Sequence, residues 1–308
     1  MSARLDVVIV TYRSADDIRT CLASVEPALE RFPDARIIVV DNGSDDDVAD
    51  AVSGISDRLT LILRDDNDGF AVGCHAGAEA STASALLFLN PDAVVDASAI
   101  DTLVRTSDSH PGAGIVGGRS VLPDGGTDHQ SWMGRPTMWS ALCFASGASS
   151  VFPGSRVLDP ESGRDWLETS RAVPVVSGGM MLVEREVWDA LDGFDRSYFL
   201  YGEDVDLCLR ARRAGWSPRV TREAIYSHEV GSSSAGSNRL PLVLRGRATT
   251  YRRHYPRPLG ALAAQLLVAG TGLRAVGARF RPAGGRRAHP AQHWQESWRR
   301  RREWREGW

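Results

Sequence analysis

The chain has 308 residues, of which 43% are hydrophobic, and its formal net charge is −3. A chain of this length and composition can bury a substantial core, either as one large domain or as a domain with an appendage. The four cysteines are widely spaced and form no CxxC pair, which argues against a disulfide framework or a thiolate metal cluster and favours a reducing cytosol.

The first hundred residues alternate short apolar runs with helical patterns. The run at residues 5–10 has the β-branched, nearly continuous character of a strand buried on both faces, and further strands are expected at 36–40, 59–63 and 85–89. Ser14, with Asp17 three residues later, predicts the capped start of a helix that reaches about Arg31. A second helix, rich in small residues, is expected from about Val72. This alternation predicts an α/β fold with a parallel, doubly wound sheet.

Polar residues follow these strands at the point where each one ends. They are Thr11, Asp41, Asp68 and Asp92. Because ligands of such sheets bind at the carboxyl ends of the strands, this repeated placement predicts an active cleft at that edge. Asp41 is in the usual place for a carboxylate that binds a ribose or a base edge. It is equally placed to shape an Asx-turn with Gly43.

The middle of the chain is less regular. A strand is expected within residues 112–121, and residues 123–171, rich in Gly, Ser, Pro and Trp, predict a loop-dominated excursion. An apolar run at 173–183 is interrupted at Ser177-Gly178-Gly179, where glycine either lets a substrate approach the backbone or forms a simple bulge. A short helix is expected at 184–191. A further strand at 219–227 precedes His228 and a Gly/Ser-rich loop at 231–237.

Residues 201–216 (YGEDVDLCLRARRAGW) place Glu203, Asp204 and Asp206 in the first turn of a short amphipathic helix. Carboxylates are stabilised there by the free backbone N–H groups and the positive end of the helix dipole. Capping alone accounts for about 0.3–1 kcal/mol per charge and does not need three acids behind an aromatic, glycine-containing loop. A carboxylate at the mouth of a pocket can instead act as a general base on a substrate hydroxyl.

Asp92 and His228 both follow predicted strands although they are far apart in sequence. A hard divalent ion prefers oxygen ligands and accepts an imidazole. A single histidine is more often structural, but the matching acid at Asp92 and the acidic helix start favour a metal site. An ion held by Asp92, His228 and a diphosphate would stabilise charge on a phosphate leaving group.

These motifs carry a resemblance to a known family. The series VVIVTYRS, VVDNGSDD, NDGFAVGCHAG, LFLNPD, GFDRSYFLYGEDVDLCLRARRAGW and SHEVGSSS resembles the family 2 glycosyltransferases of the GT-A fold, and within them the bacterial rhamnosyltransferases. The match covers residues 5–235 in the expected order. It implies a GT-A fold, which is Rossmann-like with a mostly parallel sheet flanked by helices.

The resemblance also implies roles for single residues. Asp92 corresponds to the acid of the DxD-type motif that holds Mg²⁺ or Mn²⁺ on the donor diphosphate, and His228 completes that metal site. Asp204 corresponds to the catalytic base, with Glu203 as the neighbouring candidate. The candidate contacts for the nucleotide-diphospho sugar are Thr11, Tyr12, Asp41, Asn67, Phe70, Asn90 and Asp92.

The chain departs from the family pattern at two positions. Asn90 replaces the first acid of a strict DxD motif, which leaves the metal fewer charged ligands. His75 stands in GCHAG where relatives usually carry Asn, which puts the preferred donor sugar or nucleotide in question. A dinucleotide-binding dehydrogenase is a poor alternative because no GxGxxG follows the first strand.

The C-terminal part has a different composition. We expect an amphipathic helical segment at 241–280, because residues 259–276 carry Leu259, Leu262, Ala263, Leu266, Leu267 and Gly270 at helical spacing. Its uncharged run of about 15 residues is too short to span a bilayer unaided. From Arg274 onward there are ten Arg against three Glu, interleaved with four tryptophans, and we expect residues 281–308 to be a flexible basic tail.

Apolar helix, clustered arginine and tryptophan together suit a segment that lies on an anionic cytoplasmic leaflet. The alternatives are a helix that packs on the domain with a disordered tail, or, less well supported, nucleic-acid binding. The strand-like run that begins almost at the N-terminus leaves no room for a signal peptide, so a cytoplasmic protein, peripheral on the inner face of the membrane, is expected.

The sequence thus predicts an inverting glycosyltransferase in residues 1–240. Its donor would be a nucleotide-diphospho sugar, with dTDP-L-rhamnose favoured by the resemblance, and its acceptor a glycan or a polyprenyl-linked glycan. The competing hypothesis is a catalytically silent module that binds sugar nucleotides or glycans.

Overall fold

The computed structural model describes residues 4–122, 125–126, 128, 131–162, 170–228, 239–278 and 291–308. The chain divides into two compact units. Unit 1 comprises Met1–Met133, Asp165–Phe199 and Asp204–Ser233, and unit 2 comprises Gly134–Arg164, Leu200–Glu203 and Ser234–Trp308. The predicted loop at 231–237 lies outside the described residues.

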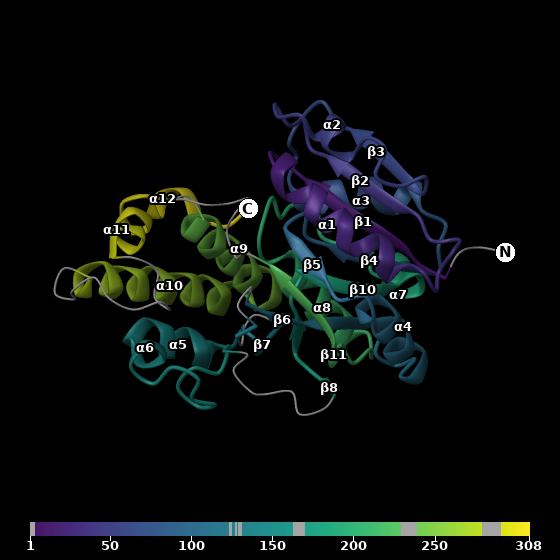
Figure 1. The fold of residues 1–308 in the computed structure, drawn as a ribbon. Helices are drawn as coiled ribbons and strands as arrows, with labels where there is room; N and C mark the ends of the chain where they lie inside the picture. The colour runs from purple at the N-terminus through teal and green to yellow at the C-terminus, as the bar shows by residue number, and fades with distance from the viewer. Residues whose placement is uncertain are drawn as a thin grey trace. The chain divides into compact units, whose positions relative to one another are not determined.

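Unit 1 is built on a mostly parallel sheet with the strand order β3-β2-β1-β4-β10-β6-β11-β5, and β8 pairs with β11 (Figure 1). The strands are β1 (Asp6–Thr11), β2 (Ile37–Asp41), β3 (Leu59–Leu63), β4 (Ala85–Leu89), β5 (Ala93–Val95), β6 (Ile115–Val121), β8 (Arg171–Ala172), β10 (Met180–Glu184) and β11 (Arg219–His228). A separate two-stranded sheet joins β7 (Trp132–Met133) to β9 (Val175–Val176).

The sheet is mostly parallel, as expected, and its central exception is β10. This strand is antiparallel to both of its neighbours, β4 and β6. The chain therefore enters β10 at the edge where β4 and β6 end, and the Ser177-Gly178-Gly179 segment reaches the carboxyl edge of the parallel strands. The sequence analysis interpreted this segment either as a point of substrate approach or as a simple bulge, and neither interpretation included the reversed direction of the strand.

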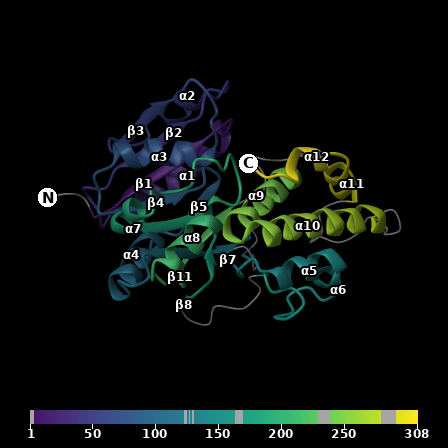
Figure 2. The ribbon, with the colours of Figure 1, turned by 180° about the vertical axis from the view of Figure 1, so that it is seen from behind.

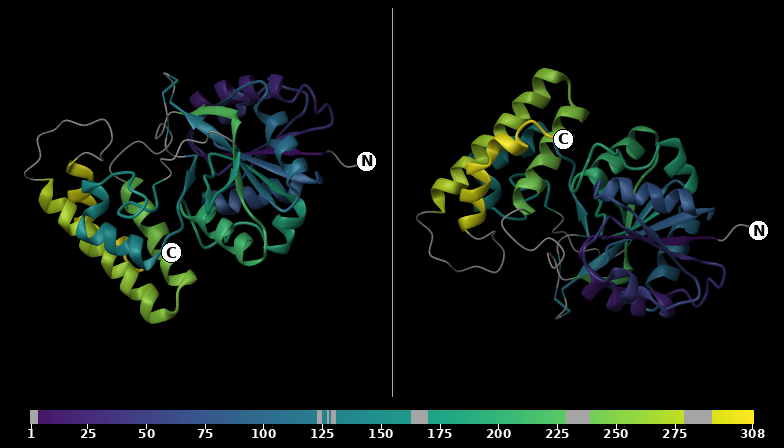
Figure 3. Two further views of the ribbon diagram at one scale, coloured as in Figure 1. Left: turned by 90° about the horizontal axis from the view of Figure 1, so that it is seen from below. Right: turned by 90° about the horizontal axis from the view of Figure 1, so that it is seen from above.

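Helices cover both faces of the sheet, as Figure 3 shows. Alternate strand residues such as Val7 and Ile9 pack with α1 (Ala15–Ala28), α2 (Val48–Val52) and α4 (Ala99–Ser109). The intervening residues, such as Val8 and Val10, pack with α3 (Phe70–Ala80), α7 (Arg185–Ala190) and α8 (Glu203–Arg213). Strands buried on both faces explain why their sequences read as continuous apolar runs.

The start of α1 corrects one detail of the sequence analysis. The Ser14 side chain makes no capping hydrogen bond with the helix, and its hydroxyl donates to the carbonyl of Tyr12 at 3.2 Å. The backbone N–H of Ala15 is instead satisfied by the Asp46 carboxylate at 2.9 Å. A tertiary neighbour thus replaces the local cap, which sequence spacing alone does not reveal.

Unit 2 is helical. It contains α5 (Met138–Ser146), α6 (Ala148–Val151), α9 (Arg239–His254), α10 (Arg257–Gly277), α11 (Ala291–Arg299) and α12 (Arg301–Trp304). Helix α10 lies between α5 and α11 (Figure 2). The loop-dominated excursion of the sequence analysis therefore contains two helices, and one of them contributes to the core of this unit through Ala141 and Phe144.

The expected flexible tail is helical where the structure describes it, in residues 291–308. Trp304 is 1% exposed, packs in the core of unit 2, and its indole N–H donates to the carbonyl of Ser297 at 2.8 Å. Burial of a large aromatic side chain offsets the repulsion expected among the surrounding arginines. Three arginines of this expected tail lie outside the described residues, namely Arg281, Arg286 and Arg287.

Candidate functional site

The carboxyl edge of the parallel strands in unit 1 gathers most of the residues singled out from sequence. Strands β1 and β2 end in register, with Thr11 opposite Asp41. Strand β4 ends at Leu89, so Asn90-Pro91-Asp92 follows at the same edge. Strand β11 ends at His228, whose register partner in β5 is Ala93. Residues separated by more than a hundred positions therefore occupy one edge of one sheet.

Asp204, in the first turn of α8, is held by two backbone N–H groups. Its Oδ2 accepts from Gly178 at 3.0 Å and its Oδ1 from Val205 at 2.7 Å. Burial raises the pKa of this carboxyl group, and the hydrogen bonds from Gly178 and Val205 oppose that rise. A positioned carboxylate with a raised pKa is suited to accept a proton.

The Ser177-Gly178-Gly179 segment connects Asp204 to the Asn90-Pro91-Asp92 turn. Gly178 donates to Asp204, and the next residue, Gly179, accepts a hydrogen bond from the Asn90 N–H at 3.1 Å. A Cβ atom at Gly179 would lie 2.8 Å from the hydroxyl of Tyr226, so this position requires glycine for packing. The segment is thus the element that brings the two predicted motifs together.

The Asn90-Pro91-Asp92 segment forms a tight turn, closed by a hydrogen bond from the Ala93 N–H to the Asn90 carbonyl at 3.1 Å. Asp92 is half-buried and lies one residue before Ala93, the register partner of His228. Among the side chains that the structure describes, no group of three or more His, Cys, Asp or Glu residues is arranged for a metal ion. The His228 side chain is outside that set, while its backbone position beside Asp92 suits an oxygen-and-nitrogen donor pair for a hard divalent ion.

Asp41 shapes the turn that follows β2. Its carboxylate accepts hydrogen bonds from the Thr11 hydroxyl at 3.1 Å, from the Ser44 N–H at 3.0 Å and from the Ser44 hydroxyl. Asp41 therefore holds the turn after β2 through Ser44 rather than through the predicted Asx-turn with Gly43, and a contact of Asp41 with a nucleotide stays a prediction. Tyr12, next to Thr11, is 37% exposed, with the Arg13 guanidinium 5.3 Å from its ring centre.

The loop before α3 lies against the aromatic loop that leads to Asp204. The side-chain Oδ1 of Asn67 accepts from the Gly69 N–H at 3.1 Å, and the Phe70 N–H donates to the Phe199 carbonyl at 2.8 Å. Gly69 has φ +95°, and a Cβ atom there would lie 2.4 Å from that carbonyl oxygen. Asn67 thus acts within its own loop, which glycine allows to approach residue 199. Asp68 pairs with Arg64 at 2.6 Å and is exposed.

His75 has a structural role that the sequence did not reveal. It is 5% exposed, its Nε2 lies 2.7 Å from the Phe194 carbonyl, and Arg196 donates to its Nδ1 at 2.9 Å. Because Nδ1 accepts, Nε2 carries the proton and the ring is neutral, in agreement with a pKa that burial lowers. His75, which stands where relatives usually carry Asn, therefore anchors residues 194–196 to α3 through these two hydrogen bonds.

The other two acids of the helix start differ from Asp204. Asp206 is buried and pairs with Arg210 at 2.7 Å, and Arg210 also donates to the carbonyls of Leu191 and Gly193. Glu203 is 6% exposed, which leaves little of it accessible to a substrate.

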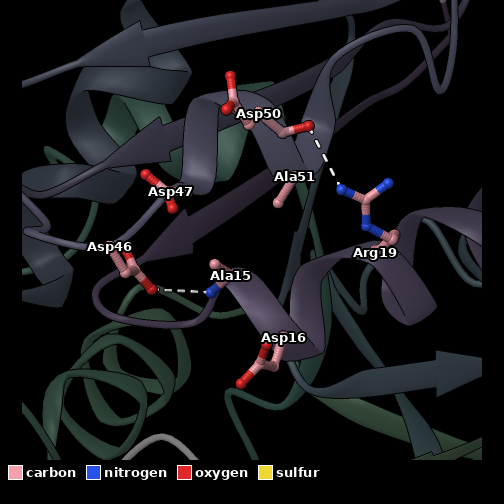
Figure 4. A pocket seen from close by; sticks show the side chains of 7 residues that line it. All are labelled: Ala15, Asp16, Arg19, Asp46, Asp47, Asp50 and Ala51. Carbon is pink, nitrogen blue, oxygen red and sulfur yellow. Dashed lines mark hydrogen bonds between the residues drawn. The ribbon is translucent and has the colours of Figure 1, made fainter.

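An open, acidic hollow of about 530 Å³ lies between α1 and α2 (Figure 4). It is lined by Ala15, Asp16, Arg19, Asp46, Asp47, Asp50 and Ala51, and none of the predicted site residues lines it. Four carboxylates against one guanidinium would repel a diphosphate, so this hollow is not a candidate for the donor site.

The chain is similar in sequence to known proteins. The chain is 29% identical over 249 residues to the N-acetylglucosaminyl-diphospho-decaprenol L-rhamnosyltransferase of Mycobacterium tuberculosis, covering 76% of this chain and 78% of that protein. It is 31% identical over 231 residues to the glycosyltransferase AglE of Haloferax volcanii, covering 73% of this chain and 66% of that protein.

Solved structures confirm the expected GT-A fold. The mannosyltransferase PcManGT from Pyrobaculum calidifontis, in complex with GDP-Man and Mn²⁺, superimposes with a TM-score of 0.57 at 18% identity, covering 94% of this chain and 78% of that one. Residues 1–349 of TarS from S. aureus give a TM-score of 0.52 at 15% identity, covering 96% and 78%. Residues 3–242 match the family described as glycosyltransferase like family 2. The chain therefore belongs to the glycosyltransferase family 2 and is an enzyme of the glycosyltransferase class.

Proposed function

We propose that the protein is an inverting enzyme that transfers a hexose from a nucleotide-diphospho sugar to a hydroxyl of a glycan or lipid-linked acceptor, with Asp204 as the general base. The position of Asp204 carries this proposal. Its carboxylate is fixed by the Gly178 and Val205 N–H groups, next to the residue that holds the Asn90-Pro91-Asp92 turn. Glu203 is the second candidate for the base.

In the proposed reaction the acceptor oxygen attacks the anomeric carbon and its proton passes to Asp204. The bond between that carbon and the diphosphate breaks on the opposite face, so the configuration inverts. No covalent intermediate with the protein forms, and positioning and electrostatics supply the acceleration.

The donor is proposed to bind along the strand ends, at Thr11, Tyr12, Asp41, Asn67, Phe70 and Asn90. We propose dTDP-L-rhamnose first, because the L-rhamnosyltransferase named above is 29% identical over most of both chains. Asp92 and His228 would hold Mg²⁺ or Mn²⁺, which fits their adjacent backbone positions and oxygen and nitrogen donors. When bound, such an ion would neutralise charge on the departing diphosphate. A cytoplasmic enzyme of cell-wall or polysaccharide synthesis fits this chemistry.

The test is a panel of nucleotide sugars assayed for transfer and for donor hydrolysis, with Mg²⁺, with Mn²⁺ and with EDTA. Turnover of one donor with metal, its loss in EDTA, and weaker metal-dependent donor binding by His228→Ala are expected. A panel in which donors bind but none turns over would favour a silent binding module. Full turnover in EDTA would remove the metal from the proposal and return His228 to a structural role.

A further inference from the structure

Helix α10 in unit 2 has two faces of different character. Its inner face consists of small and apolar residues buried against α5 and α9, and a Cβ atom at Gly270 would lie 2.5 Å from the Phe144 ring. A second face carries a line of apolar residues at spacings of three and four, which we call the outer stripe. It consists of Leu259, Leu262, Leu266, Ala269, Leu273 and Val276.

The outer stripe is exposed and carries no charge. Leu259, Leu262, Leu273 and Val276 are 43%, 50%, 49% and 53% exposed. Among the residues that the structure describes, none covers the exposed half of these side chains, while Leu273 also lies beside Gly147 and Leu266 packs partly against the core of unit 2. A line of half-exposed leucine and valine along nearly five turns is more than the scattered apolar residues of an ordinary surface, and it indicates an interaction site.

The charge of unit 2 indicates which kind of partner would bind the outer stripe. Its sequence contains nineteen arginines against six acidic residues, a formal charge of +13, while unit 1 has seventeen arginines against thirty-three acids, a charge of −16. A second copy placed on the outer stripe would bring two such basic units together, which repulsion disfavours. An apolar stripe within a basic unit instead matches a surface that is apolar inside and anionic outside.

The tryptophans of the C-terminal tail, expected from sequence to act at the membrane, are engaged within unit 2. Trp304 is buried, the Trp294 ring centre lies 6.2 Å from that of Phe144, and the Trp308 ring lies under the Arg245 guanidinium at 4.0 Å. These packed rings leave the outer stripe as the apolar surface of α10 that is open to a partner.

By length and composition, helix α10 could cross a membrane, since it has 21 residues and contains an 18-residue stretch with a mean hydropathy of 1.5. This differs from the sequence expectation, because the helix continues through Arg274 to Gly277. Crossing would separate its inner face from α5 and α9, whereas lying in the interface keeps that packing. We propose that the outer stripe of α10 docks in the plane of an anionic lipid leaflet.

The docking is independent of the proposed function and is tested without any donor. Vesicles of two parts phosphatidylcholine to one part phosphatidylglycerol are sedimented with the full chain at low salt. Wild type should co-sediment, and Leu262→Gln with Leu273→Gln should bind about tenfold more weakly, because two apolar side chains no longer enter the interface. Leu63→Gln, at a leucine of β3 that is 63% exposed, is the matched control.

Thermal unfolding checks that the double variant is folded, and Leu259→Gln with Val276→Gln, at the two ends of the helix, provides an independent pair. Wild type that stays in the supernatant, or stripe variants that bind as well as the control, would overturn the proposal. A wild-type dimer in sedimentation velocity that the stripe variants dissociate would overturn it in favour of self-association. The nucleotide-sugar turnover of the stripe variants is measured in parallel. If turnover is retained while docking fails, the docking proposal is wrong and the proposed function still stands.

Discussion

Asp204 and Asp206 lie two residues apart in one helix and have opposite environments. Asp206 faces Arg210 one turn later, and the pair holds the carbonyls of Leu191 and Gly193. Asp204 accepts hydrogen bonds from the backbone N–H groups of Gly178 and Val205, and burial raises the pKa of its carboxyl group. The pairing of Asp206 with Arg210 can be predicted from sequence because the two residues have i,i+4 spacing. The environment of Asp204 could not be predicted in this way, because it depends on a contact with Gly178, 26 positions away.

Exchanging each acid for its amide should separate the two roles. Asp204→Asn should lower turnover by about 10²–10⁴-fold, the usual scale for a positioned general base, without lowering the thermal midpoint. Asp206→Asn, the matched control in the same helical turn, should instead cost about 1.5–3 kcal/mol of stability because it weakens a charge-assisted hydrogen bond. Transfer assays and thermal unfolding of both variants check this. Near-normal turnover by Asp204→Asn would place the base elsewhere, with Glu203 next.

The pH dependence of turnover follows from the raised pKa of Asp204. A general base works only when ionised, so turnover should rise with pH through a pKa above the ordinary value for aspartate. The folded state also binds this proton more tightly than the unfolded state, so the contribution of Asp204 to stability should increase as pH falls through the same pKa. A rate profile whose acid limb follows an ordinary carboxyl pKa would contradict this assignment.

At the scale of elements, strands were easier to predict than their directions. The run at 85–89 coincides with β4, because a strand buried on both faces leaves a continuous apolar signature. The run at 59–63 coincides with β3, although this edge strand is only partly buried. The reversal of β10 depends on how the chain returns from its excursion, and no local pattern records that. The same limit applies to His75, whose partners at 194 and 196 lie about 120 positions away.

Helix α9 packs directly on the backbone of the loop that leads into α8. A Cβ atom at Gly246 would lie 2.0 Å from the Tyr201 carbonyl oxygen, and no rotamer change can move that atom. Gly246→Ala should therefore destabilise the protein by about 1–3 kcal/mol, although alanine favours a helix. Gly277→Ala, with no neighbour within 4 Å, is the control and should be neutral or stabilising. Urea unfolding measures both, and equal midpoints would show that α9 does not press on this loop.

At the scale of the whole molecule, composition predicted the change at the C-terminal part but not its structure. Sequence separated an acidic first part from a basic last part, and the structure assigns the basic residues to a helical unit that also includes residues 134–162. The sequence did not predict that residues 134–162 belong to this helical unit, because the contacts of this segment with α9 and α10 are long-range. The clustered arginines suggested disorder at the end of the chain, but the buried Trp304 ring holds this segment in the core of unit 2.

Trp304 should therefore matter for stability. Trp304→Ala should cost about 3–5 kcal/mol, the usual cost of removing a buried tryptophan. Trp139→Ala, at a ring that is 51% exposed, should cost much less. Near-UV circular dichroism during chemical unfolding reports on both. Identical stabilities of the two variants would mean that the end of the chain is as mobile as the sequence suggested.

The two halves of the candidate site are joined by adjacent residues. Gly178 holds Asp204 and Gly179 holds the turn that contains Asp92, so the two anchoring residues are consecutive and their Cα atoms are about 3.8 Å apart. Covalent geometry limits how far these two anchors can separate, because the planar peptide between them neither stretches nor contracts. Mutations that loosen the surrounding core should therefore lower stability before they alter the separation of base and leaving group. Inserting a single residue between 178 and 179 should do the reverse, sparing the core while placing the two halves out of step.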